Sequence, residues 1–84
     1  MAISAKASTK GFGDARYRAV IEKLTAERKS QGLSQAGLAG KLGRHQQFVS
    51  RYETGERRLD VVEFVDVAHG LGLDPTELVA GISC

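Results

Sequence analysis

The sequence predicts an all-α domain, a compact bundle of five short helices. Apolar residues recur at helical spacing, i, i+3, i+4 and i+7, along most of the chain. Glycines at 32, 43, 55 and 72 follow four of these segments, where a left-handed residue commonly ends a helix. Side chains that can cap a helix N-terminus precede most of the segments. With 84 residues, the chain has room for a single modest core.

The first two helices are expected over residues 15–31 and 35–42, with Asp14 and Ser34 as their N-caps. The buried stripe of the first helix consists of Tyr17, Val20, Ile21 and Leu24. The second helix contains two internal glycines, each of which costs about 1 kcal/mol relative to alanine. Inward packing must therefore hold it, through Leu38, Ala39 and Leu42.

The third helix is expected after a turn at Gly43, opened by Arg44 and His45, and Gly55 ends it. Helical spacing points Val49 and Tyr52 inward. Its other side carries hydrogen-bonding groups and one guanidinium but no acid: Gln46, Gln47, Ser50, Arg51 and Thr54. A helix that reads base edges in the DNA major groove needs such a face. Phe48 fits either the core or contact with a thymine methyl group, and its spacing slightly favours the core.

Two further helices complete the predicted bundle. Asp60, with Glu63 at the third helical position, caps a helix over 61–71. Its four valines suggest a strand, but helical spacing fits better, with a stripe of Val61, Phe64, Val65, Ala68 and Leu71. The last helix begins at Pro75, behind the N-cap Asp74. Its apolar side consists of Leu78, Val79 and Ile82.

The net charge of +2 conceals an asymmetry along the chain. Residues 1–58 carry all twelve Lys and Arg with five acids, whereas residues 59–84 carry five acids and no Lys or Arg. We expect an electric dipole whose cationic end suits a polyanion. Many domains that bind nothing share such polarity, so the charge alone does not establish a partner.

Composition and motifs disfavour several other classes of protein. No apolar run reaches membrane-spanning length, and the first residues lack the apolar segment of a signal peptide. A single cysteine, Cys84, predicts a reducing cytoplasm. His45 and His69 lie far apart without a Cys or acid cluster at ligand spacing, so no metal site is expected. No pattern indicates an enzyme, a cofactor or a small-molecule ligand.

Residues 16–80 resemble the Cro/repressor-type (Xre) helix-turn-helix family, which includes the DNA-binding domains of lambdoid phage repressors. The resemblance is carried by Gln35, Leu38, Ala39, Leu42, Gly43, Val49, Tyr52, Glu53 and Gly55. It implies a lambda-repressor-like bundle in residues 14–84. Residues 1–13 are small and polar without helical periodicity, and we expect them to form a flexible tail. Arg44 and His45 depart from the small or apolar residues often found there, and Gly37 replaces the acid of a capping box.

The resemblance also implies roles for individual residues. Base reading falls to Gln46, Gln47, Ser50 and Arg51, because glutamine pairs with adenine and arginine with guanine. Phosphate contacts are expected from Gln35, Arg44, His45, Thr54, Arg57 and Arg58. Arg28 is expected to form a structural ion pair with Glu53.

The sequence thus predicts a cytoplasmic, nucleoid-associated regulator of transcription, a repressor, that binds a double-stranded DNA operator. A homodimer through Leu78, Val79 and Ile82 would read two half-sites about 34 Å apart. Two alternatives stay open. The same fold can serve as a protein-interaction module, and single-domain relatives include antitoxins that bind a partner protein and repress their own operon.

Overall fold

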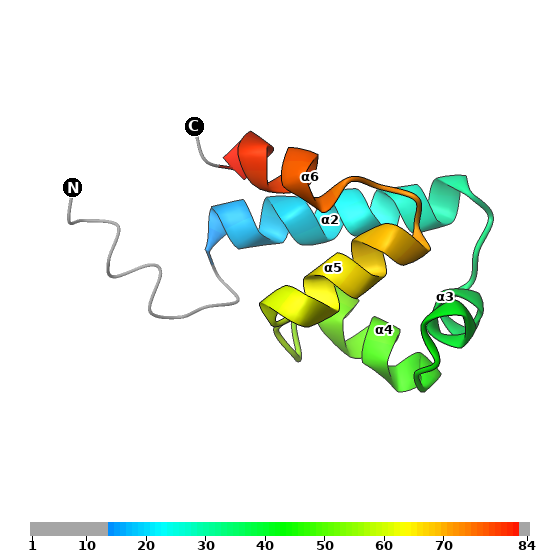
Figure 1. The fold of residues 1–84 in the computed structure, drawn as a ribbon. Coiled ribbons are helices and arrows are strands. Elements are labelled where there is room, and N and C mark those ends of the chain that lie inside the picture. Colours follow the sequence, from blue (N-terminus) through cyan, green and yellow to red (C-terminus); the bar gives the residue numbers. More distant parts are fainter. Residues whose placement is uncertain (1–13, 83–84) are drawn as a thin grey trace.

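The computed structural model describes residues 14–82, which form five helices and no strand. The helices are α2 (Ala15–Ser30), α3 (Gln35–Leu42), α4 (Gln46–Thr54), α5 (Val61–Gly70) and α6 (Pro75–Ile82), as Figure 1 shows. The predicted all-α bundle of five helices is confirmed. The predictions made for the tail over 1–13 and for Cys84 lie outside the described residues.

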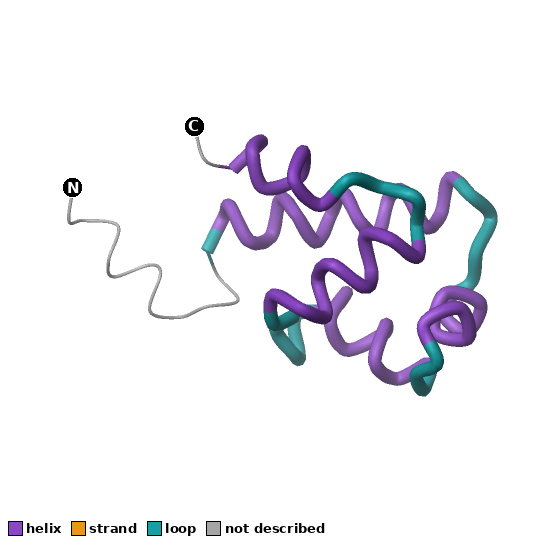
Figure 2. The backbone as a smooth tube through the Cα atoms, viewed as in Figure 1, coloured by secondary structure: helices purple, strands orange, loops and turns teal. Residues whose placement is uncertain are grey.

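The helices pack in two groups around α5. The long helix α2 lies along α6, while α3 and α4 lie together on the other side of the bundle (Figure 2). Helix α5 contacts both α3 and α6, and α4 packs on α2 and α3. Because α4 is held from two sides, its remaining surface faces away from the bundle.

The core contains side chains from four of the helices. The largest fully buried ones are Ile21, Leu24, Leu38, Val49, Tyr52 and Val67. Tyr17 and Leu42 are partly buried and pack against this cluster. Phe48 is also buried and belongs to the core, in agreement with its spacing. The predicted inward sides of α2, α3 and α4 are therefore present in the structure.

The buried stripe expected for α5 was wrong at its N-terminal end. Val61 is 74% exposed and Val62 65%, whereas Val67, left out of the prediction, is fully buried. The buried face begins instead at Glu63, which is 6% exposed. The prediction assumed that an apolar side chain would start the inward face. A carboxylate can take that place where enough donors surround it, as they do here.

Local signals place the helix ends as the sequence predicted, to within a residue. Ser34 and Asp60 accept hydrogen bonds from the backbone N–H groups of Gly37 and Glu63, each the third residue of its helix. The Glu63 side chain accepts in return from the backbone of Asp60 and completes a capping box. His45, the N-cap of α4, makes no side-chain capping bond. None of the described helices combines the length and apolar character needed to span a bilayer.

Candidate nucleic-acid interface

A tight turn joins α3 to α4 and sets the direction of both helices. Gly43 adopts φ +69°, a left-handed conformation that disfavours side-chain-bearing residues. The backbone N–H of Arg44 then donates to the Ala39 carbonyl over 2.9 Å and closes the end of α3. Since Ala39 and Val49 are both buried, the two helices are clasped by their apolar sides. The polar side of α4 is left facing out.

The outward face of α4 is polar and accessible. Gln46, Gln47 and Arg51 are exposed, and Ser50 is half-buried. Neither glutamine amide has a hydrogen-bond partner within residues 14–82. Arg51 lies 3.5 Å from the Glu56 carboxylate in an exposed pair that solvent screens. The side chains assigned to base reading therefore share one surface, and their hydrogen-bonding groups are available to a ligand.

Arg28 on α2 and Glu53 on α4 are brought together inside the domain. The Arg28 Nε and Nη2 atoms donate to the two carboxylate oxygens at 2.8 and 3.1 Å. Gln35 donates to the same carboxylate at 3.0 Å, and Arg28 Nη1 donates to the Leu33 carbonyl at 2.7 Å. The carboxylate raises the pKa of Arg28, so this guanidinium stays charged. The cluster ties α4 to α2 and to the start of α3.

Arg44 and Arg57, from opposite ends of α4, converge on Glu63 of α5. Arg57 donates Nη1 and Nη2 to the two carboxylate oxygens, each over 2.7 Å. Arg44 Nη1 lies 3.4 Å from Oε2. Both guanidinium groups also lie over the Phe48 ring, 4.5 Å and 5.3 Å from its centroid. The hydrogen bonds from Arg57 lower the pKa of Glu63 to about 2.

The other residues assigned to phosphate contact are spread around this region. Arg58 turns away from Arg57 and lies 4.6 Å over the Tyr17 ring. Its neighbour Leu59 donates its backbone N–H to the Tyr17 hydroxyl over 3.0 Å. His45 is exposed at the N-terminus of α4. The Thr54 hydroxyl donates to the Arg51 carbonyl, so its proton is used within the helix. Arg57 and Arg58, although adjacent in the chain, thus contact different partners, Glu63 and Tyr17.

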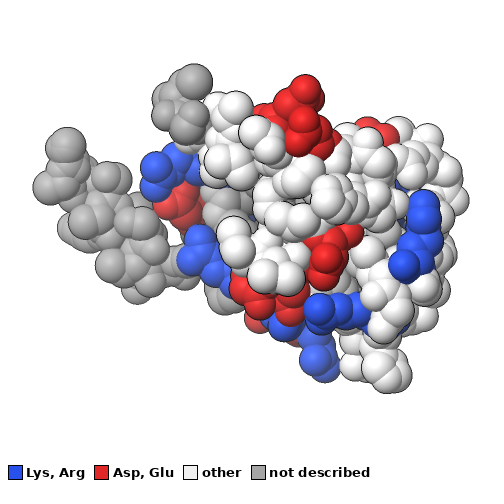
Figure 3. All heavy atoms as spheres, viewed as in Figure 1, with Lys and Arg blue, Asp and Glu red and all other residues white. Residues whose placement is uncertain are grey.

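The charge asymmetry of the sequence appears on the surface. In the view of Figure 3, acidic groups gather over its upper and central part, and basic groups lie along its edges. Helices α5 and α6 contain acids and no Lys or Arg. Arg44, Arg51 and Arg57 instead line a shallow hollow beside α4 together with Gly43, His45, Gln47 and Phe48. Three guanidinium groups thus lie beside the outward polar face of α4.

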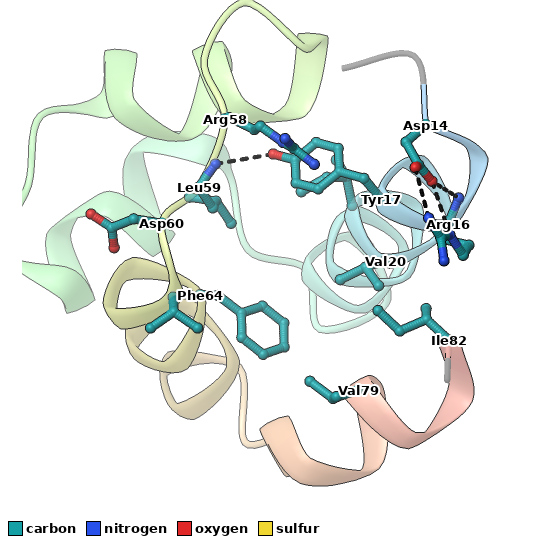
Figure 4. Close-up of a pocket in the computed structure, with 12 residues that line it drawn as sticks. Asp14, Arg16, Tyr17, Val20, Arg58, Leu59, Asp60, Phe64, Val79 and Ile82 are labelled. Atoms are coloured by element: carbon teal, nitrogen blue, oxygen red, sulfur yellow. Dashed lines mark hydrogen bonds and ion pairs between the residues drawn. The ribbon is translucent and has the colours of Figure 1, made fainter. Parts of the chain in front are cut away.

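A second hollow is apolar and lies at the other end of the bundle. It has a volume of about 280 Å³ and lies between α2, the start of α5, and α6. Figure 4 shows Val79 and Ile82 of α6 facing Val20 of α2 and Phe64 of α5 across it. Two of the three residues assigned to dimerisation therefore line this groove, and Val79 is exposed. The charged residues that line it are Asp14, Arg16, Arg58 and Asp60.

Sequence reasoning missed the role of Glu63 as the shared acceptor of two arginines. Its position three residues after Asp60 marked it as half of a capping box and nothing more. Arg44 and Arg57 lie 19 and 6 residues away along the chain, so no local spacing connects them with it. The placement of both arginines over Phe48 was missed for the same reason.

An α-helix pair clasped across a tight turn, with a polar outward face on its second helix, defines a helix-turn-helix protein. Residues 22–80 match the family model described as a helix-turn-helix domain. A solved structure, described as an XRE-family like protein from Pseudomonas syringae pv. tomato str. DC3000, is 45% identical. It superposes with a TM-score of 0.79, and the match covers 89% of this chain and 92% of that one.

A search of curated proteins finds no match. The family match and the structural relative are sufficient for assignment: the chain belongs to the Xre-type helix-turn-helix family, a family of DNA-binding regulators.

Proposed function

We propose that this protein is a sequence-specific repressor of transcription that inserts α4 into the major groove of its operator. The proposal rests on one observation: Val49 and Tyr52 of α4 are fully buried against the core, and the opposite side of the helix is exposed and polar. A reading helix needs this division, because base edges are recognised by polar side chains that can reach them from the surface of the protein. The cationic hollow beside α4 supports the same orientation.

In this proposal, two groups of side chains divide the work. Those that specify bases are Gln46, Gln47, Ser50 and Arg51. Those that contact phosphates and fix the register are Gln35, Arg44, His45, Thr54, Arg57 and Arg58. Gln35 has an amide proton beyond the one it donates to Glu53, and it lies at the start of α3, where helix N–H groups favour an anion.

The decisive experiment selects duplexes from a random pool and measures binding to the selected sequence and to a scrambled duplex. We expect saturable binding whose log K falls with log salt, with a slope near −0.9 for each phosphate neutralised. Absence of saturable binding at low salt would overturn the proposal and would indicate a protein-interaction module instead.

Two variants separate base reading from positioning. Gln46→Ala is expected to reduce discrimination between the selected and scrambled duplexes by about 1–3 kcal/mol. Arg58→Ala is the matched control, since loss of a phosphate contact should weaken both duplexes alike and flatten the salt slope by about 1. An equal loss on both duplexes for Gln46→Ala would assign Gln46 to positioning.

We further propose that two copies pair through the apolar groove, with Val79 and Ile82 at the contact; Leu78, which was also expected there, lies outside the groove and packs against the core. Exposed Val61 and Val79 both line this groove, so one continuous apolar surface is available to an identical copy. A dimer would read two half-sites about 34 Å apart. The test is palindromy in the selected duplexes together with sedimentation of the free protein. A non-palindromic site bound by one copy would exclude the dimer.

A further inference from the structure

Glu63 is an acidic residue at the edge of the surface that we propose binds DNA. Its carboxylate is almost completely buried and accepts from three groups. These are the Arg57 fork, Arg44, and the backbone N–H of Asp60 at 3.1 Å. By charge alone, such a residue should weaken the binding of a polyanion, because it offsets one of two nearby cations.

The geometry indicates what the acid does for these cations. Without it, two guanidinium groups over one phenyl ring would repel each other, and each would move freely on a long side chain. Arg44 lies just before His45, the N-cap of α4, and Arg57 lies shortly after its C-cap, Gly55. A carboxylate between them fixes both relative to the same helix. Their side chains nevertheless remain 37% and 41% exposed, so each guanidinium still faces solvent.

Glu63 is itself held rigidly. The capping box anchors it at the N-terminus of α5, and α5 packs on α3. Because Glu63 is fixed to the helical scaffold, it holds the guanidinium groups of Arg44 and Arg57 in positions that their flexible side chains alone would not maintain. Ordering these side chains before DNA arrives reduces the entropy lost on binding.

We propose that Glu63 is a positioning residue for operator binding, which holds Arg44 and Arg57 over Phe48 in the arrangement that two operator phosphates require. The inference rests on the proposed DNA-binding function. Charge alone predicts that removing this carboxylate strengthens binding to the selected duplex. The inference predicts the opposite, that its removal weakens this binding.

The test compares Glu63→Gln with Asp66→Asn on the selected and scrambled duplexes. Both variants raise the net charge by one. Glutamine retains an oxygen that can accept from the Asp60 N–H, so the cap of α5 is preserved. Asp66 is exposed on the same helix and has no side-chain partner within residues 14–82. It therefore supplies the charge change without disturbing the arginines.

We expect Glu63→Gln to weaken binding to the selected duplex about tenfold, which corresponds to ~1.4 kcal/mol. Binding to the scrambled duplex should stay unchanged or tighten, since loosely held cations still serve non-specific attraction. Asp66→Asn should bind both duplexes at least as tightly as the wild type. Equal or tighter binding of Glu63→Gln to the selected duplex would overturn the inference.

A second variant guards against loss of folding. Arg57→Lys keeps the charge of the protein and the cap of α5, but an ammonium cannot form the two-point fork. It should lower the ratio of selected to scrambled binding as Glu63→Gln does, and an unchanged ratio would overturn the inference. If the wild type itself binds no DNA, the proposed function fails. If the wild type binds and both variants match it, only the role of Glu63 fails.

Discussion

Two glutamates in this domain accept forked hydrogen bonds from arginine, and they differ in what surrounds the arginine. At Glu53 both partners are buried, with Arg28 9% and Glu53 7% exposed in their side chains. At Glu63 the acid is equally buried, but Arg44 and Arg57 remain 37% and 41% exposed. The first cluster lies between α2, α3 and α4, whereas the second lies beside the outward face of α4.

We infer from this difference that exposure of the cation, more than hydrogen-bond geometry, decides whether an ion pair can only hold helices together or can also bind an external anion. A guanidinium whose donors all face the interior can only hold helices together. One that offers its edge to solvent can also bind an external anion. The two clusters should therefore respond differently to mutation: stability should depend mainly on Glu53 and its partners, and DNA affinity mainly on Glu63 and its partners.

The largest expected effect on stability is that of Arg28→Ala. The substitution leaves the Glu53 carboxylate buried without its charged partner, and such losses cost about 3–5 kcal/mol. Urea denaturation followed by circular dichroism measures the change. Arg57→Ala is the comparison: because Arg57 is more than one-third exposed and Glu63 keeps Arg44 and the Asp60 N–H as partners, its loss should cost less, about 1–2 kcal/mol. Similar losses in the two variants would contradict the proposed division.

Acid should act on the Glu63 cluster in a defined direction. The pKa of Glu63 is lowered from 4.5 to about 2, chiefly by the Arg57 hydrogen bonds, so the folded state binds this proton less readily than the unfolded chain. Its contribution to stability is present above about pH 4.5 and is lost as the pH falls towards 2. Between about pH 5 and 2, the free energy of unfolding should therefore decline less steeply in Glu63→Gln than in the wild type.

Urea denaturation at a series of pH values tests this expectation. Some slope will remain in the variant, since the pKa of Asp14 is also lowered to about 2 by its hydrogen bonds to Arg16. Parallel curves for wild type and Glu63→Gln would mean that the Arg57 contact does not stabilise the folded state.

The smallest expected effect concerns Tyr52, next to Glu53 in the chain. Its hydroxyl is fully buried, and within the described residues it has no hydrogen-bond partner. Burial disfavours the phenolate and raises the pKa of Tyr52. Tyr52→Phe should leave the free energy of unfolding unchanged or raise it by about 1 kcal/mol, because an unpaired polar atom leaves the core. A loss of stability above about 1 kcal/mol would reveal a partner for the hydroxyl.

The helix ends and the two sides of α4 could be predicted because they depend on nearby residues. Capping by Ser34 or Asp60 involves groups three positions apart, and the left-handed turn at Gly43 depends on one residue. The inward spacing of Val49 and Tyr52 leaves one direction for Gln46 and Arg51 to face. The same reasoning failed for α5, where it placed Val61 inside and overlooked Val67.

By itself, the sequence determined an all-α bundle, the limits of its helices and the polar side of α4, since these follow from the periodicity of a single helix and from local capping residues. The Arg28–Glu53 pair was expected from the family resemblance, but the tertiary structure alone decided the partners of Arg44, Arg57 and Arg58. Arg57 pairs with Glu63, Arg58 stacks on Tyr17, and Arg44 joins the first pair across 19 residues. These partners are brought together by packing between helices, and a long flexible cation accepts whichever carboxylate or ring that packing places within reach.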